Sequence, residues 1–319
     1  MAQRGGRPLL TRARRVALAL HEITRAGLPG AGHPTRPAPL TGPEVVAHRG
    51  ATAEAGEHTL AAYRHAAAIG ADAVECDVRL TRDGVLVCVH DRKISRTSNG
   101  RGVVSALRLA ELEQFQFGPR RPKGRTRWAD DEIRSVTDEP DLENGLVLTL
   151  DRLLEYVTAS PGTVRLAIET KHPTRHTRKV EEELVKCLRR YGLLGAGRPV
   201  EWAGLPAVRM MSFSQLAVRR MQDLAPGMPT VQLIGKRLRP LRRELLSTTS
   251  ATAVGPGMAV IRADPGFVAA AHAAGKEVHV WVVNRPADMD LVRELGVDVA
   301  ITDEPDELLR RLGRNSAAS

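Results

Sequence analysis

Aromatic residues are scarce in this chain, making up only 3% of its 319 residues. So few rings leave no visible stacking platform for nucleic-acid bases, and the core must consist mainly of Ala, Val, Leu and Ile. Hydrophobic residues still account for 42% of the sequence, which is enough for a sizeable core. The length permits either one large barrel or two ordinary domains.

Cysteines and long apolar runs are also in short supply. The three cysteines are scattered and form no Cys-x-x-Cys pair, which disfavours a zinc site or a disulfide framework. Reduced thiols predict a cytoplasmic protein. No stretch approaches the ~20 apolar residues of a membrane span, and the apolar run at 16–20 is short for a signal peptide. We therefore expect no integral membrane segment.

Positive charge is in excess and unevenly placed. The formal net charge is +10, and residues 1–40 carry seven arginines against one glutamate. Further basic runs occupy 120–127 and 236–243. A solvated arm and solvated loops are the favoured interpretation, and weak contact of the arm with an anionic surface is the alternative. We expect a small-molecule partner and no nucleic acid.

Strand-like and helix-like segments alternate from Val45 onward, which indicates a parallel sheet covered by helices. We predict a TIM-type (β/α)8 barrel at 44–312, with a long excursion at 98–147 after the third strand. A largely disordered basic arm at 1–43, with one helical stretch at Thr11–Arg25, precedes it, and a tail at 313–319 follows. Nine candidate strands compete for eight barrel positions, and Met258–Ile261 has the weakest strand pattern of the nine. The candidate strands are Val45–Ala47, Ala73–Val78, Val85–Val89, Val164–Ile168, Ala207–Met211, Val231–Ile234, Met258–Ile261, Val278–Val283 and Val297–Ile301. The candidate helices are Thr59–Ile69, Thr149–Val157, Arg178–Tyr191, Ser214–Leu224, Pro265–Ala274 and Ala287–Leu295.

Polar side chains recur where four of these strands end. In a parallel barrel the carboxyl ends of the strands share one rim, and barrel active sites sit there. We therefore expect these residues to converge on one site. They are His48 with Arg49, Glu75 with Asp77, His90 with Asp91, and Glu169 with Lys171.

Two of these carboxylates are spaced for an inward-facing metal site. Glu75 and Asp77 share one face of their strand, while Cys76 points to the other face with apolar neighbours and should meet the helices. Unpaired carboxylates inside a barrel are costly. A divalent cation would remove that cost, with Glu169 as a third ligand, and oxygen-only ligands suit Mg²⁺ or Ca²⁺. A structural ion-pair network is the alternative.

Two histidines and two cations complete the predicted site. His48 and His90 could be a general acid and a general base, although either alone is more often a hydrogen-bonded structural residue. Arg49 and Lys171 supply fixed positive charge, which suits a phosphate during displacement. Metal, histidines and cations together are a consistent set for phosphodiester cleavage.

The order of these motifs resembles the glycerophosphodiester phosphodiesterase family over about residues 45–311. Two positions depart from the family pattern, because Gly56 stands where Pro is usual and His58 where Asn is usual; we expect the second change to alter a helix cap more than the chemistry. The matching segments are His48-Arg49-Gly50, Glu57-His58-Thr59, Glu75-Cys76-Asp77, Thr81-Arg82-Asp83-Gly84, His90-Asp91, Glu169-Thr170-Lys171, Ser212-Phe213, Trp281-Val282-Val283-Asn284 and Thr302-Asp303-Glu304-Pro305.

The resemblance implies a barrel enzyme that hydrolyses a glycerophosphodiester to glycerol 3-phosphate and an alcohol. It implies a divalent cation on Glu75, Asp77 and Glu169, His48 as base and His90 as acid with the reverse left open, and phosphate contacts from Arg49 and Lys171. For Trp281 it implies an apolar wall against the glycerol, with packing as an equal alternative. Glu57 would bind substrate or, as we slightly prefer, brace the His48 loop.

Two rival functions remain at this stage. A phospholipase-type phosphodiesterase of similar barrel design would need an exposed apolar ridge at the entry, and the aromatic-poor sequence suggests none. A non-catalytic binding protein would be favoured by loss of a histidine or carboxylate, and every one is kept.

Deleting residues 1–40 tests whether the basic arm belongs to the catalytic unit. Its composition cannot build a core, so turnover of a water-soluble glycerophosphodiester should be nearly unchanged in steady-state assays. A large loss of activity in a truncated chain with an unchanged circular dichroism spectrum would contradict this expectation.

Overall fold

The computed structural model describes residues 42–53, 55–118, 145–159, 162–173, 178–235 and 242–314. The predicted helix Thr11–Arg25, the basic run 120–127 and most of the run 236–243 lie outside these ranges. Among the described residues no helix is long and apolar enough to cross a membrane.

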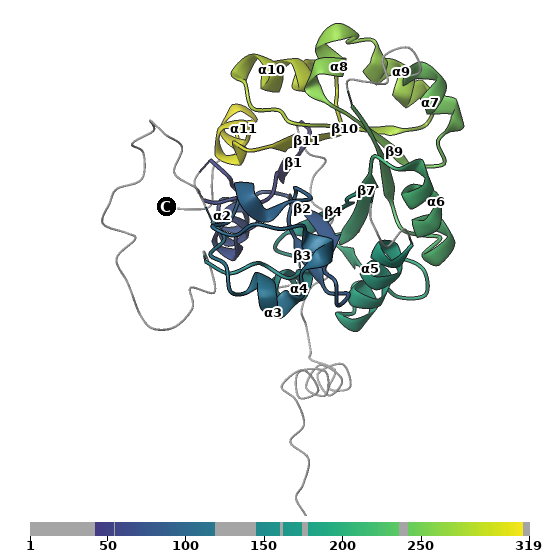
Figure 1. The fold of residues 1–319 in the computed structure, drawn as a ribbon. Helices are drawn as coiled ribbons and strands as arrows, with labels where there is room; N and C mark the ends of the chain where they lie inside the picture. Colours follow the sequence, from purple (N-terminus) through teal and green to yellow (C-terminus); the bar gives the residue numbers. More distant parts are fainter. Residues whose placement is uncertain are drawn as a thin grey trace, which may run out of the picture. The chain divides into compact units, whose positions relative to one another are not determined.

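Eight parallel strands close into a barrel, which confirms the predicted fold (Figure 1). The ring closes because the first strand pairs with both the last strand and the second one. In order around the barrel the strands are β1 (Glu44–Ala47), β2 (Ala73–Leu80), β4 (Arg165–Thr170), β7 (Val208–Ser212), β8 (Thr230–Ile234), β9 (Ala253–Pro256), β10 (Glu277–Val280) and β11 (Val299–Thr302).

Helices follow the strands and cover the outside of the barrel (Figure 1). The chain forms them because apolar residues recur at helical spacing and the ends carry suitable caps: the Thr59 hydroxyl accepts from the Ala62 amide, and Pro286 and Pro305 occupy first turns. The helices are α2 (Leu60–Ala68), α4 (Leu150–Ala159), α5 (Lys179–Arg190), α6 (Gln215–Leu224), α7 (Arg242–Thr248), α8 (Met258–Ala263), α9 (Phe267–Ala273), α10 (Pro286–Glu294) and α11 (Pro305–Arg311).

One predicted strand is wrong: Met258–Ile261 is the start of helix α8, and the strand of that repeat is β9, five residues earlier. β9 reads Ala-Val-Gly-Pro, and the last two residues disguise it, because both are depleted in strands. The barrel requires the glycine. A Cβ on Gly255 would lie 2.6 Å from the Leu233 side chain inside the barrel.

The strand predicted at Val85–Val89 exists as β3 (Leu86–Cys88), but it pairs antiparallel with β2 and is not one of the eight barrel strands. The turn Thr81-Arg82-Asp83-Gly84 explains this, since so short a connection can form a hairpin but not a parallel crossover. Thr81 Oγ1 donates to Asp83 at 2.6 Å, and Gly84 adopts φ +85°. The hairpin extends β2 beyond the rim.

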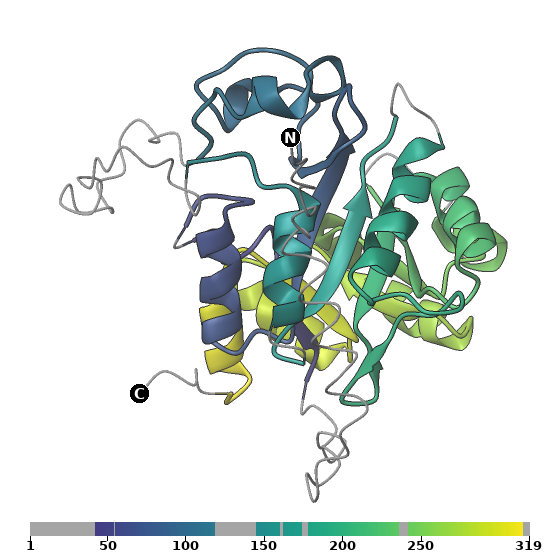
Figure 2. The same cartoon turned by 90° about the horizontal axis from the view of Figure 1, so that it is seen from below.

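Beyond the carboxyl end of β2 lies the described part of the excursion, which begins at Ile94, earlier than its predicted start at residue 98 (Figure 2). It is a compact layer with its own small core, in which Ile94 and Leu112 are fully buried. Its elements are η1 (Ile94–Arg96), η2 (Val104–Ala106) and α3 (Leu109–Leu112); a further hairpin, β5 (Glu201–Trp202) and β6 (Leu205–Pro206), precedes β7.

A buried ion pair network lies where the strands begin, opposite the rim. Glu44 of β1 accepts from Arg209 of β7 and lies 3.2 Å from Arg165 of β4. Glu44 and Arg209 are each 8% exposed. One carboxylate therefore neutralises two guanidiniums that come from different barrel strands.

Glu44→Gln should destabilise the fold by about 3–5 kcal/mol, because it leaves two largely buried guanidiniums without their counter-charge. The free energy of unfolding in guanidinium chloride measures this. Asp264→Asn is the matched control: it breaks the exposed Arg243–Asp264 pair and should cost about 0–1 kcal/mol. Equal effects of the two variants would contradict the expectation.

Candidate active site and metal centre

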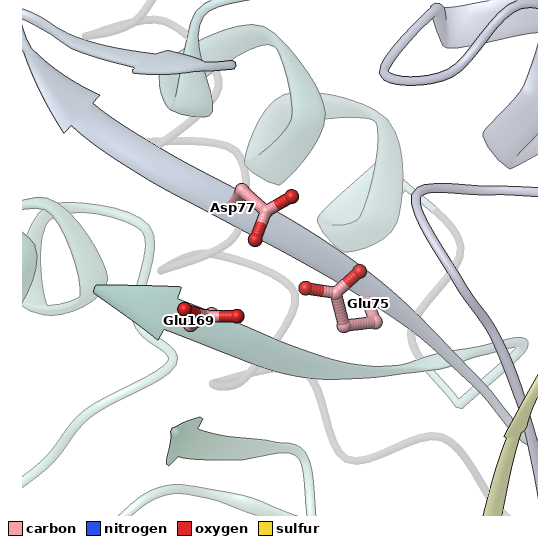
Figure 3. Close-up of side chains that lie close together, drawn as sticks. All are labelled: Glu75, Asp77 and Glu169. Atoms are coloured by element: carbon pink, nitrogen blue, oxygen red, sulfur yellow. The ribbon is translucent and has the colours of Figure 1, made fainter. Parts of the chain in front are cut away.

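Three carboxylates meet inside the barrel near the carboxyl ends of two adjacent strands (Figure 3). Glu75 and Asp77 lie on β2 and Glu169 lies on β4, where it pairs in register with Asp77. All three are buried, and one oxygen from each lies within 4.8 Å of the others. Cys76 packs in the outer core between barrel and helices, so strand alternation turns the carboxylates inward as predicted.

Burial and mutual repulsion act strongly on this cluster. They raise the pKa of Glu75 well above its usual range and the pKa of Glu169 to about 8. Asp77 differs: burial would raise its pKa as well, but the hydrogen bond from His58 and the charges of Lys171 and Arg49 outweigh it, so that the pKa lies well below its usual range. The cluster is therefore short of positive charge at Glu75 and Glu169.

Two cations that the sequence placed on the rim do reach this cluster. Lys171 Nζ lies 2.8 Å from Asp77 and 2.7 Å from Glu169. Arg49 Nε lies 3.0 Å from Asp77, and its backbone amide donates to Glu75 at 3.0 Å. Arg49 adopts φ +58°, which aims this amide inward. Three carboxylates thus share two cationic side chains.

His58 is a site residue to which the sequence assigned no place in the carboxylate cluster. Its Nε2 lies 3.0 Å from Asp77 and its Nδ1 lies 2.8 Å from the Tyr63 hydroxyl. That hydroxyl also donates to the backbone carbonyl of Glu75. His58 is 6% exposed, and burial lowers its pKa despite Asp77. The departure from the family's Asn was the available signal.

His48 is oriented by a carboxylate that directly follows the last strand of the barrel. Its Nδ1 lies 2.7 Å from Oδ1 of Asp303, which also accepts from Thr52, while Oδ2 accepts from Asn284 at 2.6 Å. Burial opposes ionisation of Asp303, but its bond to His48 prevails and the pKa falls to about 2. Asp303 and Asn284 lie in segments that match the family, but the sequence alone assigns them no role.

His90 has a similar carboxylate partner. Its Nδ1 lies 2.7 Å from Asp91 Oδ1, and Arg79 donates twice to its backbone carbonyl. Burial, reinforced by the charges of Lys171 and Arg49, lowers the pKa of His90 to about 4. With Nδ1 engaged in each case, both histidines have Nε2 available for a ligand.

Glu57 and Trp281 both have polar partners within the protein. Glu57 is held by the guanidinium of Arg96 and lies 3.4 Å from Arg49, an arrangement that braces the loop after β1. Trp281 donates to the Gly255 carbonyl at 2.7 Å and packs against the barrel interior. Phe213 meets the Trp281 ring edge-on and is 44% exposed. A single exposed ring is not the apolar ridge that a phospholipase-type enzyme would need.

Comparison with known proteins decides the family. Residues 48–307 match the family described as glycerophosphoryl diester phosphodiesterase. The chain belongs to the glycerophosphoryl diester phosphodiesterase family. Family members are enzymes, phosphoric diester hydrolases, so this chain belongs to the same class.

Curated relatives agree over most of the chain. A probable glycerophosphodiester phosphodiesterase 1 of Mycobacterium tuberculosis is 42% identical, covering 82% of this chain and 90% of its own. A glycerophosphodiester phosphodiesterase of Bacillus subtilis is 31% identical, covering 82% and 84%.

Solved structures of the family share the barrel. A putative glycerophosphoryl diester phosphodiesterase of Silicibacter pomeroyi superposes with a TM-score of 0.69 at 25% identity, covering 88% of this chain and 94% of that one. A phosphodiesterase of Oleispira antarctica, solved with the product sn-glycerol-3-phosphate, superposes with a TM-score of 0.67 at 24% identity, covering 85% and 97%.

Proposed function

We propose that this phosphodiesterase hydrolyses glycerophosphodiesters to glycerol 3-phosphate and an alcohol, using a divalent cation and two histidines. The observation that carries the proposal is the buried Glu75, Asp77 and Glu169 cluster, flanked by two cations and by two carboxylate-oriented histidines. Family membership supports the reaction class, and glycerol 3-phosphate is the product held by the Oleispira relative.

The carboxylate cluster fits a hard divalent cation. Its donors are oxygens only, as Mg²⁺ and Ca²⁺ prefer, and burial leaves Glu75 and Glu169 with raised pKa values that a cation would lower again. Glu75, Asp77 and Glu169 would hold the ion, with His58 fixing the orientation of Asp77 through its hydrogen bond. When bound, the ion supplies Lewis acidity toward a phosphoryl oxygen.

The cationic side chains would bind the substrate phosphate. Arg49 and Lys171 bring fixed charge to a low-dielectric site, where stabilisation of charge that develops on phosphoryl oxygens is strong. Trp281 and its neighbour Phe213 would form an apolar wall against the glycerol carbons. Glu57 would act as a brace for Arg49 instead of a direct substrate ligand, because its carboxylate is already shared by two guanidiniums.

His48 and His90 would share the proton transfers. Asp303 holds Nδ1 of His48, so that Nε2 of His48 can take a proton from the hydroxyl group that attacks phosphorus. His90 would protonate the leaving alcohol. Its pKa of about 4 makes it neutral in the free protein, so an acid role requires that the bound phosphodiester anion raise this pKa.

The catalytic unit in this proposal is residues 44–312, with the basic arm at 1–43 and the tail at 313–319 outside it. The arm would contribute at most a weak contact with anionic surfaces. Neither rival function gains from the site: no proposed ligand, histidine or cation is missing from it.

Removing divalent cations tests the metal. Exhaustive dialysis against a chelator should abolish release of glycerol 3-phosphate, measured by a coupled assay, and added Mg²⁺ or Ca²⁺ should restore it. Glu169→Gln should weaken cation binding in calorimetry, because it removes one of three charged ligands. Asp264→Asn, which removes only the exposed pair with Arg243, serves as control. Full turnover by metal-free enzyme would refute the proposal.

Replacing each histidine separately tests the acid–base pair and assigns its roles. His48→Gln and His90→Gln should each lower kcat by about 10² to 10⁴-fold on a diester with an aliphatic leaving alcohol, while cation affinity stays unchanged. A nitrophenol leaving group needs little protonation, so it should rescue only the variant that lacks the acid. Near-normal rates for both variants would show that the histidines are not catalytic.

A further inference from the structure

The guanidinium of Arg96 is shared between the carboxylates of Glu57 and Asp91, which contact the proposed site residues Arg49 and His90. Its Nη1 and Nη2 lie 2.5 and 2.7 Å from the two oxygens of Glu57, and its Nε lies 2.5 Å from Oδ2 of Asp91. All three nitrogens are engaged, in a planar fork that lysine does not possess.

Each partner of Arg96 in turn contacts a residue of the site. Asp91 uses its other oxygen for His90 Nδ1, at 2.7 Å. Glu57 lies 3.4 Å from Nη1 of Arg49, whose Nε is 3.0 Å from the carboxylate of Asp77. One guanidinium therefore connects the segment that carries His90 with the loop that carries Arg49.

Charge balance at the mouth of the site depends on the same guanidinium. The side chains of Glu57 and Asp91 are 19% and 32% exposed. Without Arg96, Glu57 would keep Arg49 and Asp91 would keep His90 as a charged or polar partner, and negative charge near the proposed phosphate site would rise. Glu57 would also pull more strongly on Arg49, which would then be drawn away from Asp77 and from the substrate.

The excursion provides the framework that brings Arg96 to this place. Arg96 is the last residue of η1, two residues after the fully buried Ile94. The Ser98 hydroxyl and amide both bond the Ile94 carbonyl, which fixes the turn that follows. The Arg96 side chain itself is 47% exposed, so its pairs are screened by water and should contribute little to overall stability.

We propose that Arg96 is a positioning residue for catalysis, which orients His90 through Asp91 and keeps Arg49 available for phosphate by holding Glu57. This rests on the proposed function. It assigns the excursion a role: the layer above β2 supplies the connection between the segment that carries His90 and the loop that carries Arg49.

Steady-state kinetics of the full chain in its metal-loaded form test this role. On a glycerophosphodiester with an aliphatic leaving alcohol, Arg96→Met should lower kcat by about 10- to 100-fold, a part of what proton transfer contributes, and should raise KM. Arg96→Lys keeps the charge but not the fork. It should therefore restore KM toward the wild-type value while kcat stays low.

A double-mutant cycle separates positioning from a merely structural effect. If Arg96 acts on kcat through His90, Arg96→Met should change kcat less than about 2-fold in a His90→Gln background. The melting temperature of the single variant Arg96→Met should match that of the control variant Arg243→Met. The control breaks the exposed pair with Asp264 and should leave kcat and KM unchanged.

Two results would overturn the inference: an Arg96→Met kcat within 2-fold of wild type, or a full Arg96→Met loss repeated in the His90→Gln background. Either would leave the proposed function intact, because that function stands or falls on wild-type turnover of the same substrate.

Discussion

The crowding of three carboxylates inside a barrel is the constraint on which the rest of the site depends. Glu75, Asp77 and Glu169 are buried within 4.8 Å of one another, where mutual repulsion and poor solvation oppose their ionisation. Apolar side chains fill the rest of the barrel interior, Ala73, Leu233 and Ile301 among them. The fold can carry this cluster only because positive charge and hydrogen-bond donors are brought to the same rim.

The cations and the hydrogen-bond donor that offset the repulsion between these carboxylates come from different parts of the chain. Lys171 follows directly on β4 and lies between Asp77 and Glu169. Arg49 lies in the loop after β1, and His58 is the residue just before the N-cap of α2. Asp77 receives most of this support, which is why its pKa falls while those of its neighbours rise. That imbalance is what a bound cation would correct.

The side chains around the carboxylate cluster follow one pattern: His48, His90 and Arg49 are each in contact with a further carboxylate. Asp303 stands behind His48, Asp91 behind His90, and Glu57 behind Arg49. Arg96 connects the last two of these carboxylates. The barrel thus supplies the inner cluster, and loops and the excursion supply the side chains that orient it.

The sequence by itself determined the barrel, the inward direction of Glu75 and Asp77, and the common rim, because these follow from local periodicity and from the rule that parallel strands end together. It failed at β9, where Gly255 and Pro256 hide a strand whose glycine is required by a side chain across the barrel. It also counted β3 among the barrel strands, although a four-residue turn makes it a hairpin.

Only the tertiary structure decided which residues support the site. His48 and Asp303 are 255 positions apart, and the bonds from His58 to Asp77 and from Arg96 to Glu57 span 19 and 39. Such pairs leave no periodic trace in one sequence. They form because barrel closure brings the first and last strands together, and because the excursion places η1 over the rim.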